Sequence, residues 1–270
     1  MITSKQQYSG KAVLITGASS GIGEALAKRF AALGANLVLV ARRNEGLNQL
    51  AKDLQKFRVE SLCCQTDISQ DGEIEKAVKA AITKFGRIDV VVAGAGYAAA
   101  GNLEDMSLQD YRNQFEVNVF GVLRTVYACL SELKKTNGQL AIIGSVVSEI
   151  SMPHDTAYCM SKHALAGLSD GLRAELNQYG ISLTFILPGF VDTGVHHVNN
   201  KNEPGKGRDS DPPPKFLLLP PTQAAKVIER AITARRNKQV VTFHGKVVLF
   251  INRLFPGIFA WALRSKPARI

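Results

Sequence analysis

Cysteine is scarce in this chain of 270 residues, and its four cysteines show no C-x-x-C spacing. That count is too low for a disulfide scaffold, and the spacing does not fit a structural metal site. The adjacent histidines His196 and His197 do not fit one either, because neighbouring side chains of an extended chain point apart. We therefore expect a reducing compartment and no metal ion. The cysteines are Cys63, Cys64, Cys129 and Cys159.

Long apolar runs are also missing. The first 17 residues, MITSKQQYSGKAVLITG, lack the apolar core of a signal peptide. The most apolar stretch, residues 246–264, is interrupted by Asn252, Arg253 and the pair Pro256-Gly257. A spanning helix needs about 20 predominantly apolar residues. The sequence thus predicts a cytoplasmic protein without a transmembrane helix.

Acidic residues are rare near the C-terminus. Residues 222–270 hold ten lysines and arginines against one acid, Glu229, whereas the other 221 residues hold 23 cations and 22 acids. The net charge of +10 therefore belongs mainly to the tail. A nucleic-acid groove would place its cations on a face of the main fold, so we expect no nucleic-acid partner.

Short apolar runs alternate with helix-like segments along the body of the chain. The runs at 11–16, 36–40, 89–93, 139–143 and 182–187 are continuous, as in parallel strands buried on both faces. Helical segments such as 23–32 and 74–85 separate them, each followed by a helix-ending glycine, Gly34 or Gly86. This order predicts an α/β fold with a doubly wound, Rossmann-type parallel sheet. We expect one domain, with a catalytic body over 1–221 and a basic, apolar, helical extension over 222–270.

A glycine-rich loop follows the first expected strand. Residues 16–23 read TGASSGIG and place Gly17, Gly21 and Gly23 between a strand and a helix. Glycines permit a tight turn there and let backbone N–H groups approach a pyrophosphate at the start of the helix. A plain strand–helix loop is the alternative, but the context favours a dinucleotide site.

The end of the second expected strand indicates which dinucleotide binds. An acid that binds the ribose is expected about 20 residues past the glycines, but the sequence there is Val40-Ala41-Arg42-Arg43. Guanidinium groups suit a 2′-phosphate, so we predict NADP(H) over NAD(H). The alternative is a pair of solvated arginines. Asp67, after the third strand, is expected to bind the adenine amino group or, with Ser69, to cap a helix.

Tyr158 and Lys162 lie four positions apart in AYCMSK, residues 157–162. On a helix such residues share one face, and a cation one turn away favours the ionised form of a phenol. A surface tyrosine beside a solvated lysine is the alternative. With a nucleotide loop in the same chain, we expect Lys162 to make the Tyr158 hydroxyl a usable proton donor.

Together these motifs resemble the short-chain dehydrogenase/reductase family over about the first three quarters of the chain. TGASSGIG, Asp67, Asn118 in FEVNVFG, Ser145 in IIGSVVS, Tyr158 with Lys162, and the Pro188-Gly189 pair in LPGFVDTG follow the family's order. The resemblance implies hydride transfer, with Tyr158 as general acid or base, Ser145 orienting the substrate oxygen, Lys162 holding the nicotinamide ribose, and Asn118 anchoring a water. It implies cofactor contacts from Gly17, Ser19, Ser20, Gly21, Ile22, Gly23, Arg42, Arg43, Asp67, Ile68, Ala93, Gly94, Ala95, Tyr158, Lys162, Pro188, Gly189, Val191 and Thr193.

The chain departs from the family at one motif. Where the family usually has Asn-Asn-Ala-Gly, this sequence has Ala93-Gly94-Ala95-Gly96. The small residues still allow close approach of a cofactor. The missing amide side chains remove hydrogen bonds that would support the neighbouring strands, so we expect lower local rigidity.

The substrate end is less specific. Residues 194–221, rich in Gly, Pro and Asn, have the length and composition of a lid. The aromatic, basic tail over 246–264 fits either an interfacial segment on anionic lipid or a helix pair that roofs the pocket or packs on a second subunit. GNLEDM, residues 101–106, together with the tail is similar to 3-ketodihydrosphingosine reductases.

The sequence therefore predicts an NADPH-dependent reductase in lipid metabolism. Its substrate would be a lipophilic ketone of the 3-ketosphinganine, 3-oxoacyl, steroid or retinoid type. The alternatives are NADP-dependent oxidation of a lipophilic alcohol, or a non-catalytic NADP-binding protein at a membrane. The family resemblance implies a homodimer or homotetramer.

Overall fold

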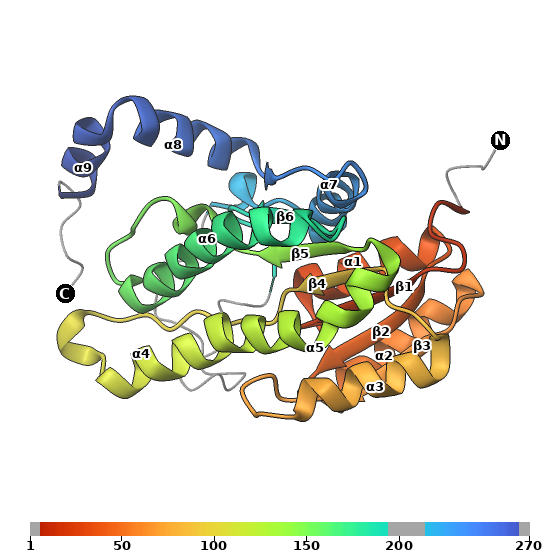
Figure 1. Ribbon diagram of the computed structural model, residues 1–270. Coiled ribbons are helices and arrows are strands. Elements are labelled where there is room, and N and C mark those ends of the chain that lie inside the picture. The colour runs from red at the N-terminus through yellow and green to blue at the C-terminus, as the bar shows by residue number, and fades with distance from the viewer. Residues whose placement is uncertain (1–5, 194–213, 265–270) are drawn as a thin grey trace.

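The computed structural model describes residues 6–193 and 214–264, apart from the side chains of 258 and 262–264. Its strands form one parallel sheet in the order β3-β2-β1-β4-β5-β6-β7 (Figure 1). The strands are β1 (Ala12–Thr16), β2 (Asn36–Ala41), β3 (Ser61–Gln65), β4 (Val90–Ala93), β5 (Gln139–Ile143), β6 (Ser182–Leu187) and β7 (Lys238–Val240).

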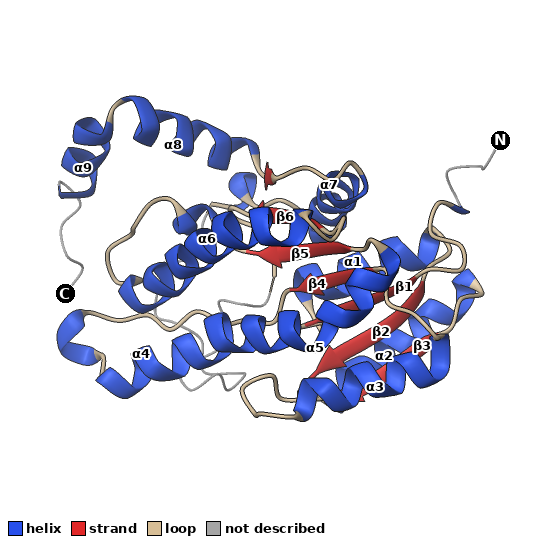
Figure 2. Cartoon of the chain, viewed as in Figure 1, coloured by secondary structure: helices blue, strands red, loops and turns tan. Residues whose placement is uncertain are grey.

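Helices cover both faces of this sheet (Figure 2). The side chains of α1, α2 and α7 pack in one apolar cluster, and those of α3, α5 and α6 pack in a second cluster on the other face. The helices are α1 (Gly21–Ala32), α2 (Asn44–Leu54), α3 (Glu73–Phe85), α4 (Leu108–Phe115), α5 (Gly121–Thr136), α6 (Thr156–Asn177), α7 (Pro221–Thr233), α8 (Phe243–Leu254) and α9 (Pro256–Arg264). A π-helical turn (Glu116–Phe120) lies between α4 and α5.

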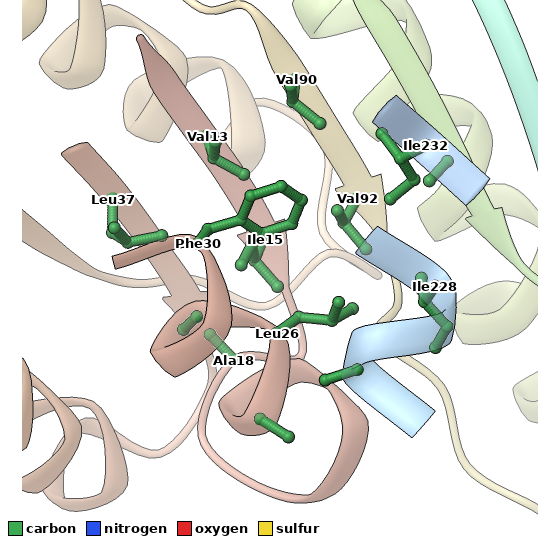
Figure 3. Close-up of a cluster of buried hydrophobic side chains, with 14 of the residues drawn as sticks. Val13, Ile15, Ala18, Leu26, Phe30, Leu37, Val90, Val92, Ile228 and Ile232 are labelled. Atoms are coloured by element: carbon green, nitrogen blue, oxygen red, sulfur yellow. The ribbon is translucent and has the colours of Figure 1, made fainter. Parts of the chain in front are cut away.

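The strands are continuous apolar runs because helices cover both faces of the sheet. Figure 3 shows one side, where Ile15 of β1 lies among Phe30 of α1 and Ile228 of α7. Alternate residues such as Leu14 face the second cluster instead. Every residue of β1 is buried, so neither face of the strand can carry a polar side chain without a partner.

The predicted doubly wound fold is confirmed. The expected runs at 36–40, 89–93, 139–143 and 182–187 match β2, β4, β5 and β6 to within one residue, and both expected helices form. Gly86 caps α3 with φ +72°, and Gly34 follows α1 with φ +88°, as helix-ending glycines do. The strand β7 was not expected, because its three residues, Lys-Gln-Val, carry no apolar run.

The basic segment after residue 221 therefore divides in two. Helix α7 and strand β7 belong to the core, since Ile228 and Ile232 are fully buried and β7 extends the sheet beside β6. Helices α8 and α9 follow at the outer edge (Figure 1). No described helix has both the length and the apolar character that a bilayer crossing requires. The boundary at residue 221 stays a prediction.

The strand order places the candidate site. Strand β1 pairs with β2 on one side and β4 on the other, so the chain changes direction between β1 and β4. In open α/β sheets the crevice for a ligand lies outside the carboxyl ends of the strands at this point. The loops that follow β1, β2, β4, β5 and β6 all open there, and they carry many of the predicted cofactor residues.

Candidate active site

The glycine-rich loop has the close contacts that its glycines predict. A β-carbon built on Gly17 would lie 2.9 Å from the Ala95 Cα, and one built on Gly23 would overlap the carbonyl of Gly17. Gly17 and Gly21 also have φ of +75° and +58°, a region that favours glycine. Larger residues would push the first turn away from the ends of β1 and β4.

The start of α1 presents backbone donors to this crevice. Ser20 is the N-cap, with extended backbone, but its side chain makes no capping hydrogen bond. The first N–H groups of a helix lack partners within the helix and, with the helix dipole, form an anion site. These are the N–H groups of Gly21, Ile22 and Gly23, so the loop fits a pyrophosphate.

Thr193 lies against the same loop from across the crevice. Its Cγ2 would be 2.9 Å from a β-carbon built on Gly21, which places the segment after β6 beside the start of α1. Within this segment Val191 forms a bridge with Leu219. The Pro188 carbonyl accepts a hydrogen bond from the N–H of Val146, 2.8 Å away. The predicted cofactor residues of β1 and β6 are therefore brought together.

Arg42 and Arg43 lie where β2 ends and α2 begins, and both are exposed. The first turn of α2 touches the glycine-rich loop, because a β-carbon on Gly46 would lie 3.0 Å from the Cβ of Ser19. The two arginines thus flank the loop on the side where the adenosine ribose of a dinucleotide is expected. No acid occupies this strand end.

Asp67 does not have the capping role that one reading of the sequence gave it. Helix α3 begins at Glu73 with Gly72 as its N-cap, so neither Asp67 nor Ser69 caps it. Instead Asp67 Oδ1 accepts the N–H of Ser69 at 3.0 Å and its hydroxyl at 2.7 Å. This local turn fixes the carboxylate beside the buried Ile68 at the crevice edge. The predicted contact with adenine stays a prediction.

The turn Ala93-Gly94-Ala95-Gly96 is held from outside its own sequence. The Thr16 hydroxyl accepts the N–H groups of Gly94, at 3.0 Å, and Ala95, at 3.2 Å. A β-carbon on Gly94 would also lie 3.1 Å from the Thr16 carbonyl. Backbone groups of this turn thus find a partner on β1 without the two amide side chains that the family usually has.

Tyr158 and Lys162 share one face of α6, as the spacing predicts. The ammonium nitrogen of Lys162 lies 5.6 Å from the centre of the Tyr158 ring. It also donates a 2.9 Å hydrogen bond to the carbonyl of Ile143, the last residue of β5. Ser145 follows two residues later, and its hydroxyl accepts the N–H of Val147 at 3.3 Å. Ser145, Tyr158 and Lys162 therefore all lie at the carboxyl end of β5.

Asn118 joins this group from the π-helical turn. Its side chain is fully buried and donates to Ser161 Oγ at 3.0 Å, and Ser161 in turn donates to the Tyr158 carbonyl at 2.8 Å. A β-carbon on Gly96 would lie 2.9 Å from Asn118 Oδ1 and 3.8 Å from Lys162 Nζ. The structure thus brings Asn118, Lys162 and the turn after β4 into one cluster.

The Lys162 ammonium is in an unusual environment. Its residue is only 6% exposed, and no acid among the described groups offsets the burial. Desolvation therefore lowers the pKa of Lys162 from its usual value near 10.5 to about 8. A buried cation without a paired acid stabilises a negative charge that forms nearby, either on a phenol or on a ligand.

Two side chains that support the site were not singled out from the sequence. Gln114 is fully buried, accepts the N–H of Ala99 at 2.6 Å and donates to the Tyr97 carbonyl at 2.8 Å. Asn118 binds the same Tyr97 carbonyl and its N–H, both at 3.0 Å. The two amides hold the chain just after Gly96. Only the fold could reveal this, since nothing in the sequence links residue 114 to residue 97.

The second supporting side chain that the sequence did not single out is His244, at the start of α8. Its Nε2 accepts the Phe190 N–H at 3.1 Å, and the two rings stack with centres 5.2 Å apart. Burial lowers the pKa of His244, which favours this neutral, accepting form. The histidine thereby fixes the segment that runs from Gly189 to Thr193.

Replacing Gln114 with leucine tests the first of these supports. The buried N–H of Ala99 would lose its partner and the Tyr97 carbonyl would keep only Asn118, so we expect a loss of about 2 kcal/mol in the free energy of unfolding. Urea denaturation measures it. Gln109→Leu is the matched control, because that amide is exposed and bonds to exposed Asn113 on the same helix, so its loss should cost within about 0.5 kcal/mol. Equal losses in both variants would show that the buried amide holds nothing.

Part of the expected lid falls outside the described residues, namely 194–213 with His196 and His197. Within the described ranges, no three His, Cys, Asp or Glu side chains gather closely enough to hold a metal ion.

Comparison with known proteins identifies the family. A family model for short chain dehydrogenases matches residues 11–204. Dehydrogenase/reductase SDR family member 7B of Xenopus tropicalis is 30% identical over 95% of this chain and 86% of its own length. Oxidoreductase UcpA of Salmonella typhimurium is 37% identical over 73% of this chain and 77% of its own.

Solved structures agree. An alcohol dehydrogenase from Thermococcus sibiricus, complexed with 5-hydroxy-NADP, superposes with a TM-score of 0.75 at 32% identity, over 86% of this chain and 96% of that one. A short chain dehydrogenase/reductase from Burkholderia phymatum shares the fold with a TM-score of 0.83 at 24% identity, over 98% of both chains.

The fold and the glycine-rich loop define a dinucleotide-dependent oxidoreductase. The chain belongs to the short-chain dehydrogenase/reductase family, whose reaction is NAD(P)-dependent exchange between a carbonyl and an alcohol.

Proposed function

We propose that this protein reduces the carbonyl of a lipophilic substrate to an alcohol with NADPH. The observation that carries the proposal is the cluster at the end of β5, where Lys162 lies 5.6 Å from the Tyr158 ring and beside the Asn118 amide. A general acid next to a buried cation, at the crevice of a dinucleotide fold, is what carbonyl reduction needs.

In this proposal the bound nicotinamide supplies a hydride, and the protein handles position and protons. The N–H groups at the start of α1 hold the pyrophosphate, and Lys162 orients the nicotinamide ribose. Ser145 donates to the carbonyl oxygen and orients it, and Tyr158 gives the proton that this oxygen takes up. Asn118 holds α6 in place through Ser161 and ties it to the turn after β4.

Lys162 has a further effect on this proton transfer. A buried ammonium strengthens the ionised form of the phenol that remains after Tyr158 gives up its proton. Its bond to the Ile143 carbonyl fixes the ammonium at the strand end, so the stabilising charge is in place before the reaction.

The NADP(H) preference is supported by Arg42 and Arg43, just before the first turn of α2 that contacts Ser19, and by the absence of an acid at the end of β2. The Thermococcus sibiricus relative was solved with an NADP derivative. Replacing both arginines with alanine should lower the affinity for NADPH by about a hundredfold, since two charge-assisted hydrogen bonds to phosphate are lost. NADH has no 2′-phosphate, so its affinity should hardly change.

Fluorescence titration with both cofactors measures this difference. Lys52→Ala with Lys56→Ala is the matched control, because it removes the same charge from exposed positions near the far end of α2. If the arginine variant lost NADPH and NADH affinity equally, the phosphate assignment would be wrong.

A lipophilic substrate fits the side chains near the site. Phe190, in the segment after β6, stacks on His244 and is 41% exposed. Exposed apolar side chains beside polar catalytic groups are typical of pockets for apolar ligands. The narrower likeness to 3-ketodihydrosphingosine reductases stays a prediction, as do the cytoplasmic location and the homo-oligomer.

A panel of carbonyl compounds tests the function. NADPH consumption is followed with sphingoid, acyl and steroid ketones, and NADP reduction with the corresponding alcohols. We expect turnover of at least one long apolar ketone, faster than its reverse at neutral pH. Faster alcohol oxidation would favour the opposite direction. Binding of NADPH without turnover of any compound would favour a non-catalytic binding protein.

A further inference from the structure

Helix α8 carries a continuous apolar stripe on its solvent side. Phe243, Val247, Phe250, Ile251 and Leu254 have the spacing i, i+4, i+7, i+8 and i+11, which places them on one face. All are exposed, with Phe243 at 81% and Phe250 at 62%. A helix in a soluble fold normally turns such a stripe toward the core.

The opposite face of α8 already packs against the body. Gly245 is buried, with Val146 and Val240 within contact distance of its position, and Leu249 joins the cluster beneath α6. Asn252 donates to the carbonyl of Glu149 at 3.3 Å. Because this inner face holds α8 against the body, the apolar stripe on the outer face points away from the body and does not cover the pocket. It has no partner among the described residues of its own chain.

The apolar surface continues past the end of α8. Phe255 and Trp261 are 52% and 69% exposed, so α9, which follows α8 at the edge of the molecule (Figure 1), adds further exposed aromatic surface. A surface of this extent in a monomer marks an interaction site. Aromatic residues such as Trp261 favour the boundary between water and lipid.

Charge identifies the partner. Lys246 and Arg253 are exposed beside the stripe, and residues 243–270 contain five cations and no aspartate or glutamate. A two-fold dimer through this face would set the same cations of two copies against each other without an acid from the segment to balance them. An anionic lipid surface complements both the stripe and the cations.

We propose that the outer face of α8, continued by α9, docks the protein on the surface of an anionic membrane. The apolar stripe enters the boundary between headgroups and acyl chains, and the cations meet lipid phosphates. The helices lie in the plane of the surface, since α8 has 12 residues and α9 has nine. This surface is distinct from the catalytic cluster, so the proposal does not depend on the reaction.

Sedimentation with vesicles tests it. The full chain is mixed with vesicles of phosphatidylcholine alone or with phosphatidylglycerol added, and the bound fraction is measured. We expect binding to the anionic vesicles. Phe250→Asp with Leu254→Asp should lower the partition coefficient by about a hundredfold. Lys246→Gln with Arg253→Gln should lower it by about tenfold on anionic vesicles only.

Leu108→Asp is the matched control, because Leu108 is also exposed, at 73%, but lies on α4. It should bind like the wild type. Circular dichroism checks that each variant is folded, which exposed substitutions should leave intact. Failure of the wild type to bind anionic vesicles, or equal binding by the double aspartate variant, would overturn the proposal. So would sedimentation velocity showing that this variant separates a dimer into monomers, because the stripe would then face a second copy.

Discussion

Tyr158→Phe is expected to lower kcat for carbonyl reduction by about a thousandfold, the usual contribution of a general acid. The substitution keeps the ring that lies near Lys162 and removes only the hydroxyl that would give the proton. Affinity for NADPH should change little, because the ring volume is preserved. Stopped-flow rates with saturating ketone and fluorescence titration of NADPH measure the two quantities.

Tyr127→Phe is the control for the loss of a hydroxyl. Tyr127 lies on α5 and is 73% exposed, so its removal should leave both kcat and cofactor affinity unchanged. If Tyr158→Phe kept more than about a tenth of the wild-type rate, another group would have to supply the proton.

Lys162→Met is expected to inactivate the enzyme and to stabilise the free protein at neutral pH. The pKa of Lys162 is about 8 in the native state and about 10.4 in an unfolded chain, so burial of the ammonium opposes folding below pH 8. The full effect is about 3 kcal/mol. The hydrogen bond from Lys162 to the Ile143 carbonyl stabilises the wild type by about 1 kcal/mol, and methionine cannot make it. We expect a net gain of about 2 kcal/mol.

The sign of the pH dependence is specific. Between pH 8 and 10.4 the unfolded wild type binds more protons than the native state, so wild-type stability rises with pH through this window. The advantage of Lys162→Met should therefore shrink from pH 8 upward and vanish at about pH 9.7, where the remaining cost of burial equals the bond to the Ile143 carbonyl, about 1 kcal/mol. Urea denaturation of both proteins at several pH values measures it. A variant that is less stable than the wild type at pH 7 would mean that the ammonium is well paired.

The sequence carried enough information for the main features of the fold and for the centre of the site. Buried parallel strands need continuous apolar runs, so β1, β4 and β6 were readable directly. The pairing of Tyr158 with Lys162 follows from helical spacing alone, and the tight turn at Gly17 follows from its place in a glycine-rich loop.

Contacts between distant segments could not be read in this way. The three-residue strand β7 forms because its backbone pairs with β6, and no apolar run announces it. Gln114 and His244 matter through partners 15 to 54 residues away. The cap of α3 was misplaced because Gly72, at φ +79°, supplies the turn that Asp67 or Ser69 was expected to make. Side-chain chemistry predicts candidates, but only tertiary structure selects their partners.

Transfer of deuterium from labelled cofactor tests the central claim most directly. The enzyme is given NADPH deuterated at nicotinamide C4 on one face or the other, together with a ketone that it turns over, and the alcohol is examined by mass spectrometry. We predict that the wild-type enzyme places deuterium on the carbinol carbon with one of the two labelled cofactors. Tyr158→Phe should give the same labelled alcohol about a thousandfold more slowly. An alcohol without deuterium from either cofactor would contradict hydride transfer at this site.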